Sequence, residues 1–201
     1  MTNWGFTRMD ECVLLILDPL DIHGLNSRLT ELLREKYSRI TVLEYTFNKD
    51  LFKHFLSLLD VAENKSSEVY SVVGLGYGAP IALRVSLQRR LRKLVLIGYR
   101  SILISLLFDD DFRSRLKVNR GDILLLLEEY ENELMRLEPI FFFKRCPLAK
   151  EVILVRLEGE DEIGELEFNN MRSLFRRYCR RIQPRIVNID ISEFYRVNEF
   201  I

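Results

Sequence analysis

Three glycines at alternate positions, in the stretch Gly74-Leu75-Gly76-Tyr77-Gly78, constrain this chain more than any other feature. A valine-rich run from Val69 to Val73 precedes them and predicts a buried strand, and Pro80 opens an apolar segment that predicts a helix. Glycines spaced in this way indicate that the backbone takes a positive φ or packs very closely there. The stretch therefore predicts a sharp corner between a strand and a helix.

Other apolar runs alternate with helical patterns, which predicts an α/β fold with a mostly parallel sheet of about six strands and helices on both faces. Further strands are expected at 12–17, 40–45, 93–98, 151–155 and 185–191, and further helices from Asn26, Asn48 and Gly164 onward. The alternation stops between 99 and 146, where helices are expected at 102–108, 112–118 and 122–137. A length of 201 residues favours a single domain over 1–201 that carries this helical insertion.

The corner resembles the nucleophile elbow of the α/β-hydrolase family, Gly-x-Ser-x-Gly, in which the middle residue displays the attacking oxygen. The resemblance covers roughly 13–191 and implies that the insertion at 99–146 is a cap over the site. An ordinary helical subdomain that packs its leucines on the edge of the sheet is the other interpretation of this segment. In this chain the middle residue is Gly76, which has no side chain to attack an ester. The resemblance therefore predicts a degenerate elbow.

The same resemblance identifies where the other members of a catalytic triad would stand. The family takes its base from a histidine after the last strand, but the loop at 192–198 has none. The acid position is better preserved, because both Asp161 and Glu162 follow Gly159, with Glu162 the closer match by spacing. An acidic turn favoured by the dipole of the next helix is the other interpretation of these two residues.

A pocket is expected above the corner, where strand ends meet. Its expected lining is Pro19, Leu20, His23, Leu75, Gly76 and Tyr77. In an alternative interpretation, Asp18 and Asp21 join Asp161 or Glu162 there around a divalent cation, since ligands of open α/β sheets bind at this edge. A phosphate cradle is a weaker alternative, because neither a complete dinucleotide motif nor a P-loop follows the glycines. His54 is expected at a helix edge, and no cofactor and no metal are predicted.

Charge, hydropathy and cysteine content argue against a nucleic-acid-binding, a membrane-spanning or a secreted protein. Thirty basic and thirty acidic residues cancel, so no overall field attracts nucleic acid or anionic lipid. No apolar run reaches the length of a transmembrane segment, and the polar start of the chain does not resemble a secretory signal. The odd set Cys12, Cys146 and Cys179 has no metal-like spacing and argues against a disulfide framework, so buried thiols and a cytoplasmic location are expected. The bias toward Arg and Glu over Gln resembles that of heat-adapted proteins.

The missing nucleophile and base favour a non-catalytic α/β-hydrolase-like protein that acts in binding or assembly. The insertion and the run Phe141-Phe142-Phe143 are expected to form an apolar patch for a homodimer, another protein or a small apolar ligand. One alternative is a divergent ester or thioester hydrolase with an unorthodox nucleophile and with Asp161 or Glu162 as its acid.

A second alternative is a nucleic-acid-binding protein that uses the arginine-rich last helix. The basic residues concerned are Arg172, Arg176, Arg177, Arg180 and Arg181 on that helix, with Arg84, Arg89, Arg90, Arg92 and Lys93 after the corner. Net neutrality and the lack of interleaved aromatic residues disfavour this alternative, and solvated helix faces are the simpler interpretation.

Overall fold

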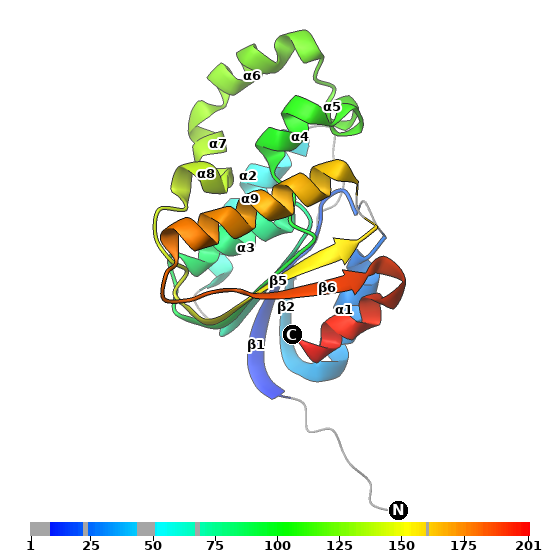
Figure 1. Cartoon of the computed structure of the whole chain (residues 1–201), viewed down its shortest axis with the longest axis vertical. Coiled ribbons are helices and arrows are strands. Elements are labelled where there is room, and N and C mark those ends of the chain that lie inside the picture. The colour runs from blue at the N-terminus through cyan, green and yellow to red at the C-terminus, as the bar shows by residue number, and fades with distance from the viewer. Residues whose placement is uncertain (1–8, 22–23, 44–50, 67–68, 160) are drawn as a thin grey trace, which may run out of the picture.

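The computed structural model describes residues 9–21, 24–43, 51–66, 69–159 and 161–201. Over these residues, six parallel strands form one sheet in the order β2-β1-β3-β4-β5-β6 (Figure 1). The strands are β1 (Met9–Ile16), β2 (Tyr37–Leu43), β3 (Ser71–Leu75), β4 (Leu91–Ile97), β5 (Ala149–Glu158) and β6 (Arg185–Asp190). The predicted parallel α/β sheet is confirmed.

Helices cover both faces of the sheet (Figure 1). One face carries α2 (Leu51–Lys65), α3 (Gly78–Ser86) and α9 (Glu162–Tyr178), and the other carries α1 (Asn26–Lys36) and the 3₁₀ helix η3 (Ile191–Glu199). Strand β1 is apolar at every position from Val13 to Ile16 because successive side chains enter the two different cores. None of the described helices has the length and apolar content needed to cross a bilayer.

Five further helices lie between β4 and β5 and form a third tier beyond α2, α3 and α9 (Figure 1). They are α4 (Ile102–Phe108), α5 (Asp110–Leu116), α6 (Ile123–Glu129), α7 (Glu131–Leu137) and α8 (Pro139–Phe142), with a 3₁₀ turn η2 (Arg120–Asp122) before α6. The single helix expected over 122–137 is wrong, because Tyr130 leaves helical geometry at φ −113° and ψ 27°. The break allows α7 to bury Leu134 and Leu137 while α6 leaves Leu124 and Leu125 exposed.

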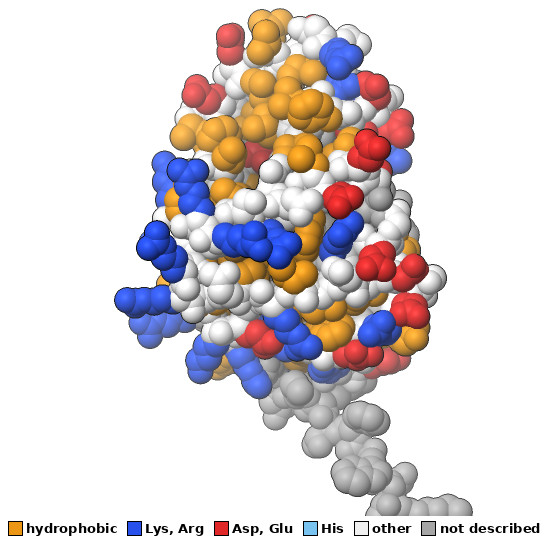
Figure 2. Space-filling view, in the orientation of Figure 1, with side chains coloured by type: hydrophobic (Ala, Val, Ile, Leu, Met, Phe, Trp, Pro, Cys, Tyr) orange, Lys and Arg blue, Asp and Glu red, His pale blue; other side chains and the backbone are white. Residues whose placement is uncertain are grey.

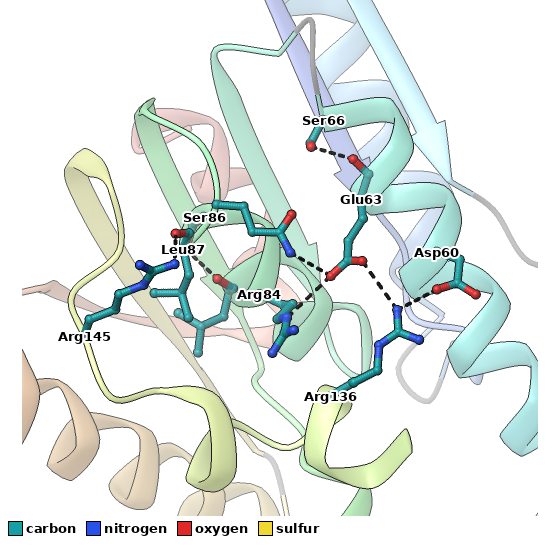
Figure 3. Close-up of polar contacts among 10 residues, drawn as sticks. Asp60, Glu63, Ser66, Arg84, Ser86, Leu87, Arg136 and Arg145 are labelled. Atoms are coloured by element: carbon teal, nitrogen blue, oxygen red, sulfur yellow. Dashed lines mark hydrogen bonds and ion pairs between the residues drawn. The ribbon is translucent and has the colours of Figure 1, made fainter. Parts of the chain in front are cut away.

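Ion pairs fix this insertion on the body of the protein (Figure 3). The Arg136 guanidinium on α7 lies 2.6 Å from a carboxylate oxygen of Asp60 and 3.4 Å from one of Glu63, both on α2. Glu63 also accepts from Arg84 on α3 at 3.4 Å and from Gln88 at 2.9 Å. Each partly exposed pair contributes no more than about 1 kcal/mol, so their main effect is to set the position of α7.

Several local predictions differ from the structure. In the run Phe141-Phe142-Phe143, expected to join an apolar surface patch, Phe143 is fully buried with its ring 4.8 Å from that of Phe175, and Phe142 is half-buried. Phe141 is the exposed residue of the run. The expectation of three unpaired buried thiols is also wrong, because Cys146 and Cys179 form a disulfide and Cys12 is free and half-buried. Asn48, where a further helix was expected to begin, lies outside the described residues.

Candidate functional site

The corner stands at the carboxyl end of β3, between β1 and β4 in the middle of the sheet. Gly76 takes the left-handed conformation with φ +55°, and its N–H donates to the Ile97 carbonyl at 2.9 Å. Gly74 serves close packing instead, since a Cβ there would lie 2.6 Å from the Ala79 Cα. Gly78 is similar, since its Cβ would lie 2.7 Å from the Leu17 carbonyl oxygen. Sterics therefore account for the alternating glycines.

The Asp18 carboxylate occupies the space where a side chain at position 76 would begin. A Cβ on Gly76 would lie 2.6 Å from the Asp18 Cγ, which is closer than real Cβ atoms approach a carbon. Asp18 follows β1 and is 5% exposed, and its Oδ1 accepts from the Leu20 N–H at 2.9 Å. The space above the corner is thus already filled by this chain.

Asn26 holds the Asp18 backbone in that position. The Asn26 Oδ1 accepts from the Asp18 N–H at 3.1 Å, and its Nδ2 donates to the Asp18 carbonyl at 2.8 Å. The helix expected from Asn26 onward is present as α1, whose cap residue Leu25 makes no side-chain cap bond. Asn26 joins the start of α1 to the end of β1.

A buried arginine lies beside Asp18 and Gly76. Arg100 follows β4 and is 2% exposed, and its Nη1 lies 2.8 Å from the Asp161 Oδ1. Asp161 also caps α9, because its Oδ1 accepts from the Gly164 N–H at 2.8 Å. Glu162, which spacing favoured as the acid, is the exposed first residue of α9. The structure thus places Asp161 rather than Glu162 against the corner.

Behind Arg100 lies a fully buried carboxylate, Glu167 of α9. One of its oxygens accepts from the Ser101 N–H at 2.9 Å and from the Ser105 hydroxyl at 3.4 Å, while the other lies 3.9 Å from the Arg100 Nε. Burial raises the pKa of Glu167 to about 9, with the Ser101 N–H and the Arg100 charge acting in the opposite direction. The Tyr77 hydroxyl joins this network by donating to the Ser105 Oγ at 2.8 Å.

A second buried carboxylate, Glu138, ties the insertion to the same network. Its two oxygens accept from the Ser101 hydroxyl and from the Leu103 N–H, each at 2.7 Å. Burial raises the pKa of Glu138 above its usual range, although these hydrogen bonds oppose the shift. Sequence reasoning missed both glutamates. Glu167 carried a signal, since it shares the buried face of α9 with Gly164, Phe168 and Met171 at helical spacing.

The cavity left at the corner is only about 10 Å³, which is the space of one water molecule at most. Its lining is Asp18, Asp21, Leu25, Leu75, Gly76, Gly98, Arg100 and Leu157. Of the six residues expected to line a pocket, Leu75 and Gly76 are in this set. Tyr77 turns instead into the apolar core, where its ring stacks on Phe112 at 4.8 Å. Leu20 is buried, Pro19 is half-buried, and His23 lies outside the described residues.

The carboxylates proposed for a divalent cation do not converge on an ion site. Asp18 and Asp21 both line the small cavity, but Arg100 lies there with them. In the described part of the chain, no three His, Cys, Asp or Glu side chains are arranged to hold a metal ion. His54, expected at a helix edge, is 7% exposed on α2. Among the described residues that line it, the corner thus presents carboxylates and a guanidinium, and no hydroxyl or thiol.

No protein-family model and no curated protein sequence matches this chain. Solved structures do match. An esterase domain from Rhodothermus marinus has a TM-score of 0.54 at 14% identity, over 96% of this chain and 85% of that one. A thermophilic esterase from the planctomycete Thermogutta terrifontis, with butyrate bound, has a TM-score of 0.51 at 10% identity, over 94% and 75%. A protein described as a hydrolase of the α/β superfamily, from Xanthomonas campestris pv. campestris, has a TM-score of 0.50 at 12% identity, over 96% and 100%.

The chain has the α/β-hydrolase fold. At these identities the likeness concerns the fold, and the activities belong to the neighbours. Gly76 stands at the strand-to-helix corner to which the sequence resemblance assigned the nucleophile.

Proposed function

We propose that this α/β-hydrolase-fold protein works by binding and assembly, through its helical insertion, and does not hydrolyse esters at its corner. The observation that carries the proposal is the Asp18 carboxylate in the space that a side chain at position 76 would need. A cavity of about 10 Å³ leaves no room for a substrate acyl group beside Gly76. The corner therefore stabilises the fold rather than presenting a reactive group.

The surface available for binding is an apolar groove of about 640 Å³ on the insertion, between α4, α6, α7 and α8. Its apolar lining is Leu103, Leu124, Leu127, Leu134, Met135 and Phe141, with Glu128 and Glu131 beside them. Figure 2 shows apolar side chains gathered over these helices at the top of the molecule. In this proposal, the helical insertion between β4 and β5 provides the surface that binds another molecule.

A second copy of the chain is the occupant we propose for this groove. Large apolar side chains are exposed on the helices that form it, with Leu124 of the lining 73% exposed, Leu125 65%, and Phe108 and Ile140 both 62%. Exposed apolar side chains and an apolar groove therefore belong to the same helices, which suits the self-complementary interface of a two-fold dimer. An exposed apolar surface of this kind marks an interaction site in soluble proteins.

Light scattering on a gel-filtration column tests the assembly. We expect the wild-type protein to elute with twice the mass of the chain, and Leu124→Glu and Met135→Lys each to shift it toward the monomer. Tyr195→Glu is the matched control, because Tyr195 is 60% exposed on η3, on the other face of the sheet. A monomeric wild type, or a dimer that survives both substitutions, would contradict the proposed interface.

The esterase activity of two structural neighbours favours a second candidate, a divergent ester hydrolase. Because Gly76 has no side chain, the nucleophile of such a hydrolase would come from another residue, and Asp161 would be its acid. Purified protein incubated with short-chain p-nitrophenyl esters and with a serine-reactive fluorophosphonate separates the two candidates. The binding proposal expects neither turnover nor labelling, and ester turnover that Asp161→Asn abolishes would establish the hydrolase.

A further inference from the structure

A basic cavity of about 630 Å³ lies at the opposite edge of the sheet from the corner, where β4 and β5 begin and α9 ends. Its lining includes five cationic side chains and no acidic one: Arg90, Lys150, Arg177, Arg180 and Arg181. Figure 2 shows Lys and Arg side chains gathered along the left margin, over the end of α9, while acidic side chains lie mainly to the right and top. The zero net charge of the chain therefore conceals separate basic and acidic regions.

The cations of this cavity come from three separate segments. Arg90 lies in the turn between α3 and β4, Lys150 lies on β5, and the three arginines belong to the end of α9 and the residues after it. All five side chains are exposed. Among the described residues, none of the five has a carboxylate within ion-pair distance. This differs from Arg84 and Lys93, which pair with Glu63 and Glu151.

The walls of the cavity are held firmly in place. The Leu148 N–H donates to the Ser86 carbonyl at 2.8 Å, and the Leu91 N–H donates to the Leu148 carbonyl at 2.8 Å. The Arg145 guanidinium donates to the Leu87 carbonyl at 2.9 Å, which joins the loop before β5 to the end of α3 (Figure 3). The Cys146–Cys179 disulfide links the same loop to the end of α9. The cations are thus mounted on a pre-formed frame, which lowers the ordering cost of binding.

Between the cations the cavity is apolar. Leu91, Pro147 and Ala149 are buried beneath it, and Leu148 is 44% exposed at its surface. A volume of this size falls within the range of roughly 300–1,000 Å³ found for small-molecule sites. Guanidinium groups match the geometry of phosphate oxygens, and the apolar floor suits a hydrocarbon or ring attached to the phosphate.

We propose that this cavity binds a small organic phosphate, with its phosphate groups on the five cations and its apolar part on Leu91, Pro147 and Leu148. The site lies apart from the filled corner and from the insertion, so it does not depend on the function proposed above. It brings together basic residues from the last helix and from the turn after α3, both of which the sequence singled out.

A nucleic-acid strand is a poorer match to the same cations. Binding of single strands uses exposed aromatic rings on which successive bases stack. The aromatic residue in the lining is Tyr178, which is half-buried and has the Arg177 guanidinium 5.4 Å from its ring centroid. A cavity of about 630 Å³ whose one aromatic ring is partly covered favours a compact ligand over a polymer.

Fluorescence anisotropy with a methylanthraniloyl derivative of ATP, at about 50 mM salt where surface charges are weakly screened, tests the site. We expect saturable binding that inorganic pyrophosphate reverses. Arg180→Glu/Arg181→Glu should weaken it by about tenfold or more, and Arg90→Glu, from a different segment, should weaken it as well. Arg115→Glu/Arg120→Glu is the matched control, because both arginines are exposed on the insertion. Thermal melts of each variant check that it is folded.

Three results would overturn the proposal. The first is failure of the ATP derivative to bind the wild-type protein. The second is binding that persists in folded Arg180→Glu/Arg181→Glu and Arg90→Glu. The third is a short oligothymidylate that binds more tightly than the ATP derivative and loses affinity in the same variants, which would assign the cations to a nucleic acid instead.

Discussion

The carboxylate of Asp18 and the α-carbon of Gly76 exclude a side chain between them, since a Cβ on Gly76 would lie 2.6 Å from the Asp18 Cγ. Two neighbouring strands produce this relationship, because Asp18 follows β1 and Gly76 follows β3. A side chain at position 76 therefore fits only if Asp18 is changed as well.

Gly76→Ser should destabilise the protein without creating an esterase. A left-handed φ costs a non-glycine residue about 1–3 kcal/mol, and the overlap with Asp18 adds a cost of similar size. Urea unfolding measures the loss. Gly24→Ser is the matched control, because Gly24 has φ +62° with no atom within 4 Å of an added Cβ, so it reports the backbone cost alone. Equal losses at the two positions would show that Asp18 moves aside freely.

The stability of the protein should fall as pH rises from about 5 to 9 because of Glu167. The folded-state pKa of Glu167 is about 9, above the ordinary value of 4.5 for this side chain, so in this window the folded state holds a proton that the unfolded state has released. The contribution is complete below pH 4.5 and is lost as pH rises through 9, with a slope of up to about 1.4 kcal/mol per pH unit. Unfolding in urea across this range should show a shallower slope for Glu167→Gln than for wild type.

Glu165→Gln is the control for that experiment, because Glu165 is 57% exposed on the same helix and pairs with Arg156. Its pH profile should follow the wild-type profile. A Glu167→Gln profile as steep as that of the wild type would mean that other groups cause the pH dependence.

Arg100→Leu should destabilise the protein by about 3 kcal/mol or more, because it removes the cation beside Glu167 and Asp161. Measured above pH 9, where Glu167 is ionised, adding Glu167→Gln should recover part of the loss, since an amide needs no counter-charge. A double-mutant cycle from denaturant unfolding measures the coupling. Strictly additive losses would show that the two side chains do not interact.

Thiol titration of the unfolded, unreduced protein should detect Cys12 and, after reduction, Cys146 and Cys179 as well. Removing the bridge by Cys146→Ser/Cys179→Ser should lower the free energy of unfolding by about 3–4 kcal/mol, because the bridge closes a loop over a sequence separation of 33 residues. Cys12→Ser serves as the control. All three thiols reacting before reduction would contradict the bridge.

The sheet was predictable because its signals are local. The apolar runs and the glycine corner each belong to one segment of the chain, and the alternation of strands with helices indicates a parallel sheet without fixing the strand order. The filling of the corner was not predictable, because Asp18, Arg100 and Glu167 come from three segments that meet only once the strand order is known. Glu167 alone carried a sequence signal, as an acid on the buried face of a helix, and that signal was missed.

The helices of the insertion and the pairing of the cysteines were harder to predict from the sequence, for different reasons. The helix break between α6 and α7 falls at Tyr130, in a leucine-rich run where no glycine or proline marks it. The pattern of 122–137 therefore gives no sign of the break. The pairing of Cys146 with Cys179 depends on α9 returning to the loop before β5, which spacing does not reveal. A disulfide also weakens the argument from cysteine content for a cytoplasmic location, since such bonds are rare in most cytosolic proteins.

The filled corner also limits how this scaffold could be redesigned. A serine placed at 76 meets Asp18, while removal of Asp18 alone opens a space beside the buried Arg100 guanidinium. Each of these single changes therefore lowers the stability of the protein before it can add any catalytic activity. A designer who wants ester cleavage from this scaffold must replace the whole interlocked group in one step and supply an imidazole from the C-terminal loop.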